Sequence, residues 1–205
     1  MNRFEHWQKV YDKVENEFSW YQAYPKTSVK LIEETGVGHH DPIIDIGGGD
    51  SHLVDALLEK GYSNLFVLDI SSQAIDRARK RLGRSESKVN WILDDVVDFK
   101  PSVKFSVWHD RAAFHFLNDD YSIQRYKDNV VRSVMPAGKF ILGTFSNNGP
   151  DRCSGLPVKQ YTEASMEKTF TGPFQKVRCF EELHETPFHT TQLFQFCLFQ
   201  RVSIS

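Results

Sequence analysis

Residues 42–51 read Pro42-Ile43-Ile44-Asp45-Ile46-Gly47-Gly48-Gly49-Asp50-Ser51. The apolar run at 43–46 predicts a short buried strand, and the apolar positions at 53–58 predict the helix that follows it. Glycine lets the chain turn tightly between them, so that backbone amides at the start of the helix can approach a ligand closely. A strand that leads through such a turn into a helix indicates an α/β fold.

The same alternation continues along the chain and ends differently. Further strands are expected at 65–68, 89–93, 105–108 and 139–145, and helices are expected near 4–18, 28–35, 71–82, 121–134 and 162–170. A turn is expected at 136–138, and a loop rich in Gly, Pro, Asn and Ser is expected at 147–157. Two long strand-like runs, 174–185 and 190–202, flank a turn at 187–189 and predict an antiparallel hairpin. The pattern predicts a doubly wound, Rossmann-like α/β sheet of seven strands, mostly parallel, with helices on both faces.

Composition fits one soluble domain. The chain has 205 residues, 40% of them hydrophobic, and 25 Lys and Arg against 27 Asp and Glu give a net charge of −2. We therefore expect a single domain, with an N-terminal aromatic lid segment (1–24), a ligand-binding core (40–145) and a C-terminal part (146–205) made of a substrate-side loop, a helix and a hairpin. A balanced charge argues against nucleic acid as a partner, and no apolar run is long enough to suggest a membrane span or a secretory signal. Oligomeric state is left open.

Three cysteines, Cys153, Cys179 and Cys197, are odd in number and widely spaced. They form no metal-binding pattern, so no metal is expected. Cys179 and Cys197 fall in strand patterns and are expected to be core residues, and Cys153 is expected to be an ordinary loop cysteine. A reducing compartment, and hence a cytoplasmic location, is the simplest interpretation.

Acidic residues stand at the ends of successive predicted strands. Asp69 follows the second strand, 20 residues after Gly49, and Asp94 and Asp95 follow the third. In an open α/β sheet, ligands bind outside the carboxyl ends of the strands, where an acid after the second strand accepts hydrogen bonds from ribose hydroxyls. The glycine triplet alone would fit an ordinary strand–helix turn equally well. With the acids, it predicts an adenosine site, in which Asp94 and Asp95 lie near the adenine amino group.

Two residues indicate whether the ligand is a dinucleotide or a methyl donor. His52 stands where a dinucleotide-binding loop requires a third small residue. Asp45 precedes Gly47 by two residues, and its carboxylate would repel a pyrophosphate but attract the ammonium and sulfonium of S-adenosylmethionine. An NAD-dependent oxidoreductase is therefore disfavoured.

These motifs resemble those of the class I S-adenosylmethionine-dependent methyltransferases. Residues 43–51 match the family's glycine motif, and 67–71, 93–96 and 135–140 match its later motifs, with Ser51 and Ala137 as departures from glycine. The resemblance implies S-adenosylmethionine as the cofactor. The expected cofactor-binding residues are Asp45, Gly47, Gly49, Ser51, Asp69, Ile70, Asp94, Asp95, Val96 and His109.

The N-terminus is similar to a narrower subgroup, the small methyltransferases that modify lysines of elongation factor 1A and citrate synthase, and their bacterial relatives. The matching residues are Trp7, Tyr11 and the run Phe18-Ser19-Trp20-Tyr21. The resemblance implies that this segment folds over the cofactor. Aromatic faces attract a sulfonium cation, so Trp7, Tyr11 and Trp20 are expected at the cofactor, although they could also simply pack a helix onto the sheet.

The end of the fourth strand carries the candidate catalytic residues Asp110, Arg111 and His115. His115 could act as a base near neutral pH, and Arg111 could hold a substrate carboxylate or form a salt bridge. Methyl transfer needs alignment more than a dedicated base, so these roles are open. We expect transfer of a methyl group to a protein lysine or a small molecule; the alternative is a non-catalytic S-adenosylmethionine-binding regulator or partner subunit.

Overall fold

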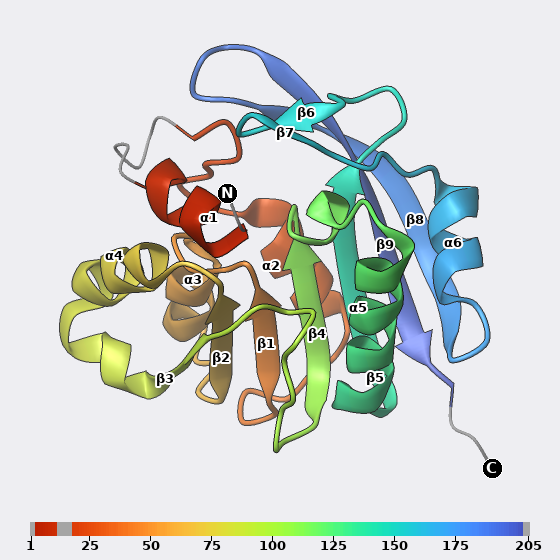
Figure 1. Cartoon of the computed structure of the whole chain (residues 1–205). Coiled ribbons are helices and arrows are strands. Elements are labelled where there is room, and N and C mark those ends of the chain that lie inside the picture. The colour runs from red at the N-terminus through yellow and green to blue at the C-terminus, as the bar shows by residue number, and fades with distance from the viewer. Residues whose placement is uncertain (1–2, 12–17, 203–205) are drawn as a thin grey trace.

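The computed structural model describes residues 3–11 and 18–202, which form a seven-stranded sheet in the order β3-β2-β1-β4-β5-β9-β8 (Figure 1). Its strands are β1 (Ile43–Ile46), β2 (Leu65–Asp69), β3 (Val89–Leu93), β4 (Phe105–Arg111), β5 (Val134–Phe145), β8 (Phe174–Glu185) and β9 (Thr191–Arg201). The first five are parallel, and β9 runs antiparallel to both β5 and β8. The predicted fold class is confirmed.

Helices cover both faces of the sheet. These helices are α2 (Lys26–Glu34), α3 (Leu53–Glu59), α4 (Ser72–Leu82), α5 (Asp120–Ser133) and α6 (Glu163–Phe170), with short turns η2 (Gly83–Lys88) and η3 (Phe114–Phe116). A further helix, α1 (Arg3–Val10), lies at one edge of the sheet. Side chains alternate along each strand: Ile44 and Trp108 join the core beneath α5 and α6, while Ile43 and Val107 join the core with α2 and α3. This period of two makes neighbouring strand residues face opposite layers.

Side-chain caps begin several helices. The Ser71 hydroxyl accepts a hydrogen bond from the backbone N–H of Ala74 and caps α4, as its sequence position predicts. Asp119 caps α5 in the same way. The α4 cap matters for the site, because it places the start of that helix directly after the carboxyl end of β2.

The carboxyl ends of the parallel strands meet at one edge of the sheet. α1 and a small hairpin of β6 (Arg152–Cys153) and β7 (Leu156–Pro157) lie above this edge in Figure 1. Chain segments separated by more than 140 residues are thereby brought to the same end of the molecule. Ligand sites of open α/β sheets lie at this edge.

Some boundaries differ from the sequence prediction. α1 ends at Val10, and the rest of the helix expected to reach residue 18 includes residues 12–17, which lie outside the described part. The turn expected at 136–138 lies within β5, where Ala137 has a φ of 62° and the pairing with β4 shifts register. The loop expected at 147–157 contains β6 and β7. Irregular pairing of this kind leaves little trace in hydrophobic periodicity.

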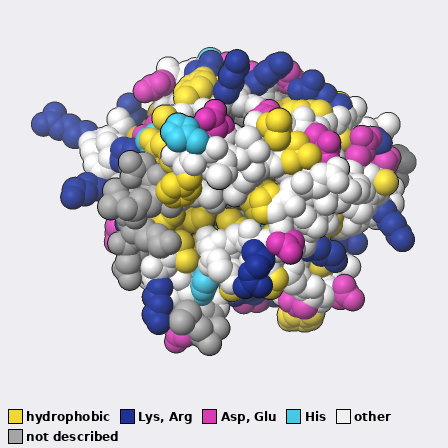
Figure 2. All heavy atoms as spheres, turned by 90° about the horizontal axis from the view of Figure 1, so that it is seen from above, with side chains coloured by type: hydrophobic (Ala, Val, Ile, Leu, Met, Phe, Trp, Pro, Cys, Tyr) yellow, Lys and Arg dark blue, Asp and Glu magenta, His cyan; other side chains and the backbone are white. Residues whose placement is uncertain are grey.

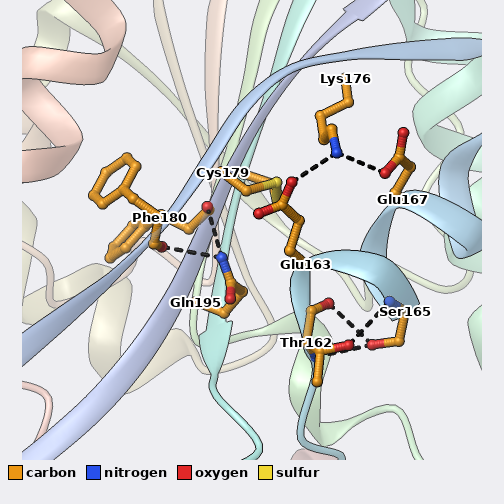
Figure 3. Close-up of a disulfide and its surroundings, with 10 residues drawn as sticks. Thr162, Glu163, Ser165, Glu167, Lys176, Cys179, Phe180 and Gln195 are labelled. Carbon is orange, nitrogen blue, oxygen red and sulfur yellow. Dashed lines mark hydrogen bonds and ion pairs between the residues drawn. A yellow bond between two sulfur atoms is a disulfide. The ribbon is translucent and has the colours of Figure 1, made fainter.

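Cys179 and Cys197 lie opposite each other on β8 and β9 and form a disulfide (Figure 3). Cys197 belongs to the core beneath α5 and α6 and Cys179 packs against it, as expected, but their pairing was not predicted from the sequence. Hairpin register brings their Cα atoms to 4.2 Å, and a separation of 18 residues in the sequence does not reveal that register. Beside the disulfide, the ammonium of Lys176 forms ion pairs with Glu163 and Glu167, which tie α6 to β8.

Candidate cofactor and acceptor site

Two connected cavities open at the carboxyl edge of the parallel strands. The large cavity, of about 760 Å³, is lined by the ends of β1–β4, by α1 and by β6. The small cavity, of about 570 Å³, lies beside the glycine turn and the segment 18–28. The residues that line both, and so mark their junction, are Tyr11, Trp20, Gly47 and Arg111.

The glycine turn after β1 forms the floor between the cavities. Gly47 has a φ of 66°, which glycine adopts without strain, and its N–H donates to the carbonyl oxygen of Leu68 at 2.7 Å. A Cβ added to Gly49 would lie 2.6 Å from the Cβ of Ala74 and 2.8 Å from the carboxylate of Asp69. The turn therefore needs these glycines to pack against α4 and to leave its backbone open to a ligand.

Asp69 at the end of β2 is held rigidly against this turn. Its Oδ2 accepts from the N–H of Gly49 at 3.0 Å, and its Oδ1 accepts from the N–H of Ser71 at 2.8 Å. Burial raises the pKa of Asp69 to about 6, against the lowering effect of these two hydrogen bonds. Each carboxylate oxygen has a second lone pair. Asp69 lines the large cavity with Ile70 and can accept hydrogen bonds from a pair of ribose hydroxyls there.

Asp45 at the end of β1 is linked to two partners from other elements. Its Oδ1 is 2.7 Å from His109 Nδ1, and His109 Nε2 is 2.8 Å from the Ser28 hydroxyl of α2. Oδ2 of Asp45 is buried without a hydrogen-bond partner among the described residues. Because a buried polar atom left unpaired is costly, this oxygen is suited to a cationic ligand group in the small cavity, which Asp45, His109 and Ser51 line.

Asp94, Asp95 and Val96 line the large cavity at the end of β3. One oxygen of Asp95 accepts from the N–H of Val97, and the other forms an ion pair of 3.0 Å with Arg3 of α1. These residues lie at the edge where the sequence analysis placed the adenine amino group. The ion pair also attaches the N-terminal segment to this rim.

α1 covers the large cavity and docks on the start of α4. The Gln8 amide donates to the Ser72 hydroxyl and accepts from the Ser71 hydroxyl, both at 2.8 Å. The ring of Trp7 lies 4.8 Å from Phe116 and 6.1 Å from Trp20, centroid to centroid. The predicted aromatic residues of the N-terminus are thus brought together over the cavity, and Trp7, Tyr11 and Trp20 all line it.

Arg111 at the end of β4 stands at the junction of the cavities. Its Nη1 donates to the carbonyl oxygen of Trp20 at 3.0 Å, and its guanidinium lies 4.6 Å from the ring centroid of Phe194. Nη2 is buried without a hydrogen-bond partner in the described part of the chain. Burial lowers the pKa of Arg111 to about 10, so the group stays cationic at neutral pH.

Asp110 and His115 lie elsewhere. Asp110 accepts from the Tyr126 hydroxyl at 2.7 Å and from two backbone N–H groups of the turn that follows it, and burial raises its pKa to about 6. His115 accepts from the N–H of Phe145 through Nδ1, and burial lowers its pKa to about 3. Neither lines the two cavities as the described residues define them. These surroundings favour a structural role over the catalytic one expected from the sequence.

Cys153 and Phe116 also line the large cavity. The loop that carries Cys153 was expected on the substrate side, but neither residue was predicted to have a role in the site. Cys153 reaches the cavity on β6, and burial raises the pKa of its thiol, which keeps it neutral. Its position depends on how the 147–157 segment folds back over β4 and β5. No local pattern in the sequence signals that contact.

Comparison with known proteins finds similar methyltransferases. Residues 43–138 match the family described as methyltransferase domain. The chain is 24% identical over 134 residues to malonyl-[acyl-carrier protein] O-methyltransferase 2 of Ilyobacter polytropus, covering 62% of this chain and 50% of that protein. It is 26% identical over 199 residues to EEF1A lysine methyltransferase 2 of Mus musculus, covering 87% and 73%. The chain thus spans about half the length of the first of these relatives.

Solved structures agree on the fold. The structure titled "Conversion of a Disulfide Bond into a Thioacetal Group during Echinomycin Biosynthesis" has a TM-score of 0.81 at 17% identity, covering 98% of this chain and 94% of that one. The N-methyltransferase NodS from Bradyrhizobium japonicum, in complex with S-adenosyl-L-homocysteine, has a TM-score of 0.70 at 18% identity, covering 97% and 99%. The matched domain, the fold, and the glycine turn and acids described above together support a class I S-adenosylmethionine-dependent methyltransferase.

Proposed function

We propose that this protein transfers a methyl group from S-adenosylmethionine to an acceptor bound in the large cavity. The observation that carries the proposal is the buried, unpartnered Oδ2 of Asp45 beside the glycine turn. An ammonium group in the small cavity would satisfy it, whereas the pyrophosphate of a dinucleotide would be repelled by the same carboxylate.

The remaining residues fit the rest of the donor. Asp69 offers lone pairs to the ribose hydroxyls, and Asp94, Asp95 and Val96 line the rim at the adenine end. When bound, the donor supplies an activated methyl group on a sulfonium that leaves as a neutral thioether. A sulfonium between the two ends would lie at the junction, where Tyr11 and Trp20 supply aromatic surface and exclude water.

The acceptor is a small molecule or a protein lysine in this proposal, since the similar proteins include enzymes named for each kind. The large cavity continues beyond the adenosine-binding acids to Arg111, Phe116 and Cys153. That space supports an enzyme with an acceptor over a protein that only binds the donor. Arg111 is the one candidate catalytic residue from the sequence analysis that lines this space, among the residues the structure describes.

The test combines binding with turnover. Donor carrying a labelled methyl group is incubated with the protein and a cell lysate, which is then separated into protein and small-molecule fractions. We expect label in one fraction with the wild-type protein and none with the Asp45→Asn variant. Calorimetry that shows tight binding of S-adenosylhomocysteine without label transfer would instead favour a donor-binding regulator.

Partners and location follow as further parts of the proposal. Within residues 3–11 and 18–202, no helix is long and apolar enough to cross a membrane. On the face above the sheet edge, positive and negative side chains are interspersed with hydrophobic ones, which does not suggest a nucleic-acid surface (Figure 2). A cytoplasmic location is proposed on the sequence grounds given above. The Cys179–Cys197 disulfide argues against this location, because disulfides are rare in reducing compartments. Thiol trapping in freshly lysed cells tests it: three free cysteines would support a cytoplasmic location, and a single free cysteine would contradict it.

A further inference from the structure

The acceptor end of the large cavity carries a positive charge with no carboxylate beside it. The acids that line this cavity, Asp69, Asp94 and Asp95, follow β2 and β3 on its adenosine side. From β4 onward, the described lining consists of Arg111, Ala112, Ala113, Phe116, Leu117 and Cys153. Arg111 is the charged member of that set, and the neutral Cys153 thiol does not offset it.

Arg111 is also incompletely satisfied. Nη1 bonds to the carbonyl oxygen of Trp20 and the guanidinium rests on the ring of Phe194, which together fix its orientation. Nη2 has no hydrogen-bond partner among the described residues. Glu182 and Asp45 act on Arg111 only at longer range. In the proposed function, the ammonium of the donor would pair with Asp45 and its sulfonium would lie near Arg111 at the junction, so that the carboxylate of the donor is the rival partner of Arg111 that the controls below distinguish.

On the basis of the proposed methyl transfer, we infer that the acceptor is a small organic acid, bound as its carboxylate by Nη2 of Arg111. Arginine is suited to carboxylates, and a charge-assisted hydrogen bond in a buried site is strong. One carboxylate oxygen would bond to Nη2 and leave the other to attack the methyl group. A protonated lysine would instead meet like charge, and the described lining of this end offers it no base.

The reaction balances without a proton acceptor. The bond between the methyl carbon and sulfur breaks, its electron pair stays on sulfur, and a bond forms between the carboxylate oxygen and the methyl carbon. Neutral S-adenosylhomocysteine and a neutral methyl ester result, so no proton moves. The neutral ester loses its charge attraction to Arg111, which assists product release. Because no proton moves, the reaction needs no base, which agrees with the position of His115 outside the cavity lining.

A matched set of probes tests the inference. Phenylacetate, 2-phenylethanol and 2-phenylethylamine share a ring and differ in the charge of the head group, and each is titrated by calorimetry into the protein saturated with S-adenosylhomocysteine. We expect phenylacetate to bind at least about tenfold more tightly than the other two. Arg111→Met should remove this preference, and Arg111→Lys should retain part of it. Preference for the amine, equal binding of the three, or no binding of phenylacetate would overturn the inference.

Two controls separate this result from its rivals. 5′-Methylthioadenosine lacks the amino-acid part of the donor; if Arg111→Met weakens S-adenosylhomocysteine but not 5′-methylthioadenosine, then Arg111 holds the carboxylate of the donor and the inference fails. Binding of 5′-methylthioadenosine also shows that each variant is folded. If S-adenosylhomocysteine does not bind the wild-type protein at all, the proposed function fails, independently of the acceptor.

Discussion

The two ends of the cavity system differ in charge and in origin. The donor end is built from acids at the ends of three adjacent strands, Asp45, Asp69 and Asp95, around one glycine turn. The acceptor end is built from aromatic rings, a thiol and Arg111, contributed by the N-terminal segment, β4 and β6. In the function proposed above, this difference in charge suits a cationic donor at one end and an anionic acceptor at the other.

The comparison also shows why one fold can serve many acceptors. Strands β1–β3 and the turn between β1 and α3 fix the donor end through backbone hydrogen bonds, such as those from Gly49 and Ser71 to Asp69. The acceptor end depends on side chains from segments that are not joined by secondary structure. Changes there can alter the acceptor without disturbing the donor, since function resides in sites placed on a common fold.

The largest expected effect comes from Asp45→Asn, which removes the charge at the small cavity and nearly preserves the shape. Loss of one partner from a buried ion pair should weaken S-adenosylhomocysteine binding by about 100-fold or more in calorimetry. 5′-Methylthioadenosine, which has no ammonium, should bind with nearly unchanged affinity. An equal loss for both ligands would mean that Asp45 acts on the turn and not on the ammonium.

Asp69→Ala should weaken the donor by about 10- to 100-fold, because charge-assisted hydrogen bonds to the ribose are lost. Both S-adenosylhomocysteine and 5′-methylthioadenosine should be affected, since both contain the ribose. With a pKa near 6, Asp69 becomes protonated below that pH, so wild-type affinity should also fall as the pH drops from 7 to 5. The exposed Asp98, paired with Arg125, supplies the control: Asp98→Ala should change neither measurement.

Asp110→Asn should change the free energy of unfolding and leave the affinities for S-adenosylhomocysteine and 5′-methylthioadenosine unchanged. The folded pKa of Asp110 is about 6 and its ordinary value is 3.8, so the folded state favours the protonated form. The raised pKa therefore adds to the free energy of unfolding in full below pH 3.8, and this contribution is lost as the pH rises through 6. The total loss is about 3 kcal/mol at most. In denaturant unfolding, the free energy of unfolding of the variant should rise relative to that of the wild type between pH 4 and pH 7. A constant difference would place Asp110 in a more hydrated site.

The smallest effect is expected at the rim. Arg3→Ala removes a partly exposed ion pair with Asp95, and pairs of this kind contribute about 0.2–1 kcal/mol. Donor affinity should change by less than about fivefold. Hydrogen exchange of residues 3–11 reports on the lid itself, and we predict stronger protection when S-adenosylhomocysteine is bound. Equal protection with and without it would mean that α1 is permanent packing.

The placement of the glycine turn and the acids at one edge of the sheet could be predicted from the sequence, because its determinants are local. A strand, a glycine turn and an acid at the next strand end occupy one continuous stretch, in which periodicity and glycine positions carry the signal. Trp7, Tyr11 and Trp20 could be placed at the cavity only through a family resemblance.

The acceptor end was predicted poorly for a physical reason. Asp110 and Arg111 are adjacent in the sequence, yet alternation along β4 sends Asp110 into the core beneath α5 and Arg111 to the cavity. Only the exact strand register separates their roles. The contact of Cys153 with the cavity depends on how distant segments pack. The Cys179–Cys197 disulfide likewise depends on the register in which β8 and β9 pair.

Calorimetry of the wild-type protein with S-adenosylhomocysteine and, separately, with NAD tests the central claim, that the acid-lined end binds a cationic methyl donor. We predict clear binding of S-adenosylhomocysteine and a melting temperature that rises with its concentration. NAD should give no heat of binding, because Asp45 and its fellow acids repel a pyrophosphate. Binding of NAD with no response to S-adenosylhomocysteine would contradict the account.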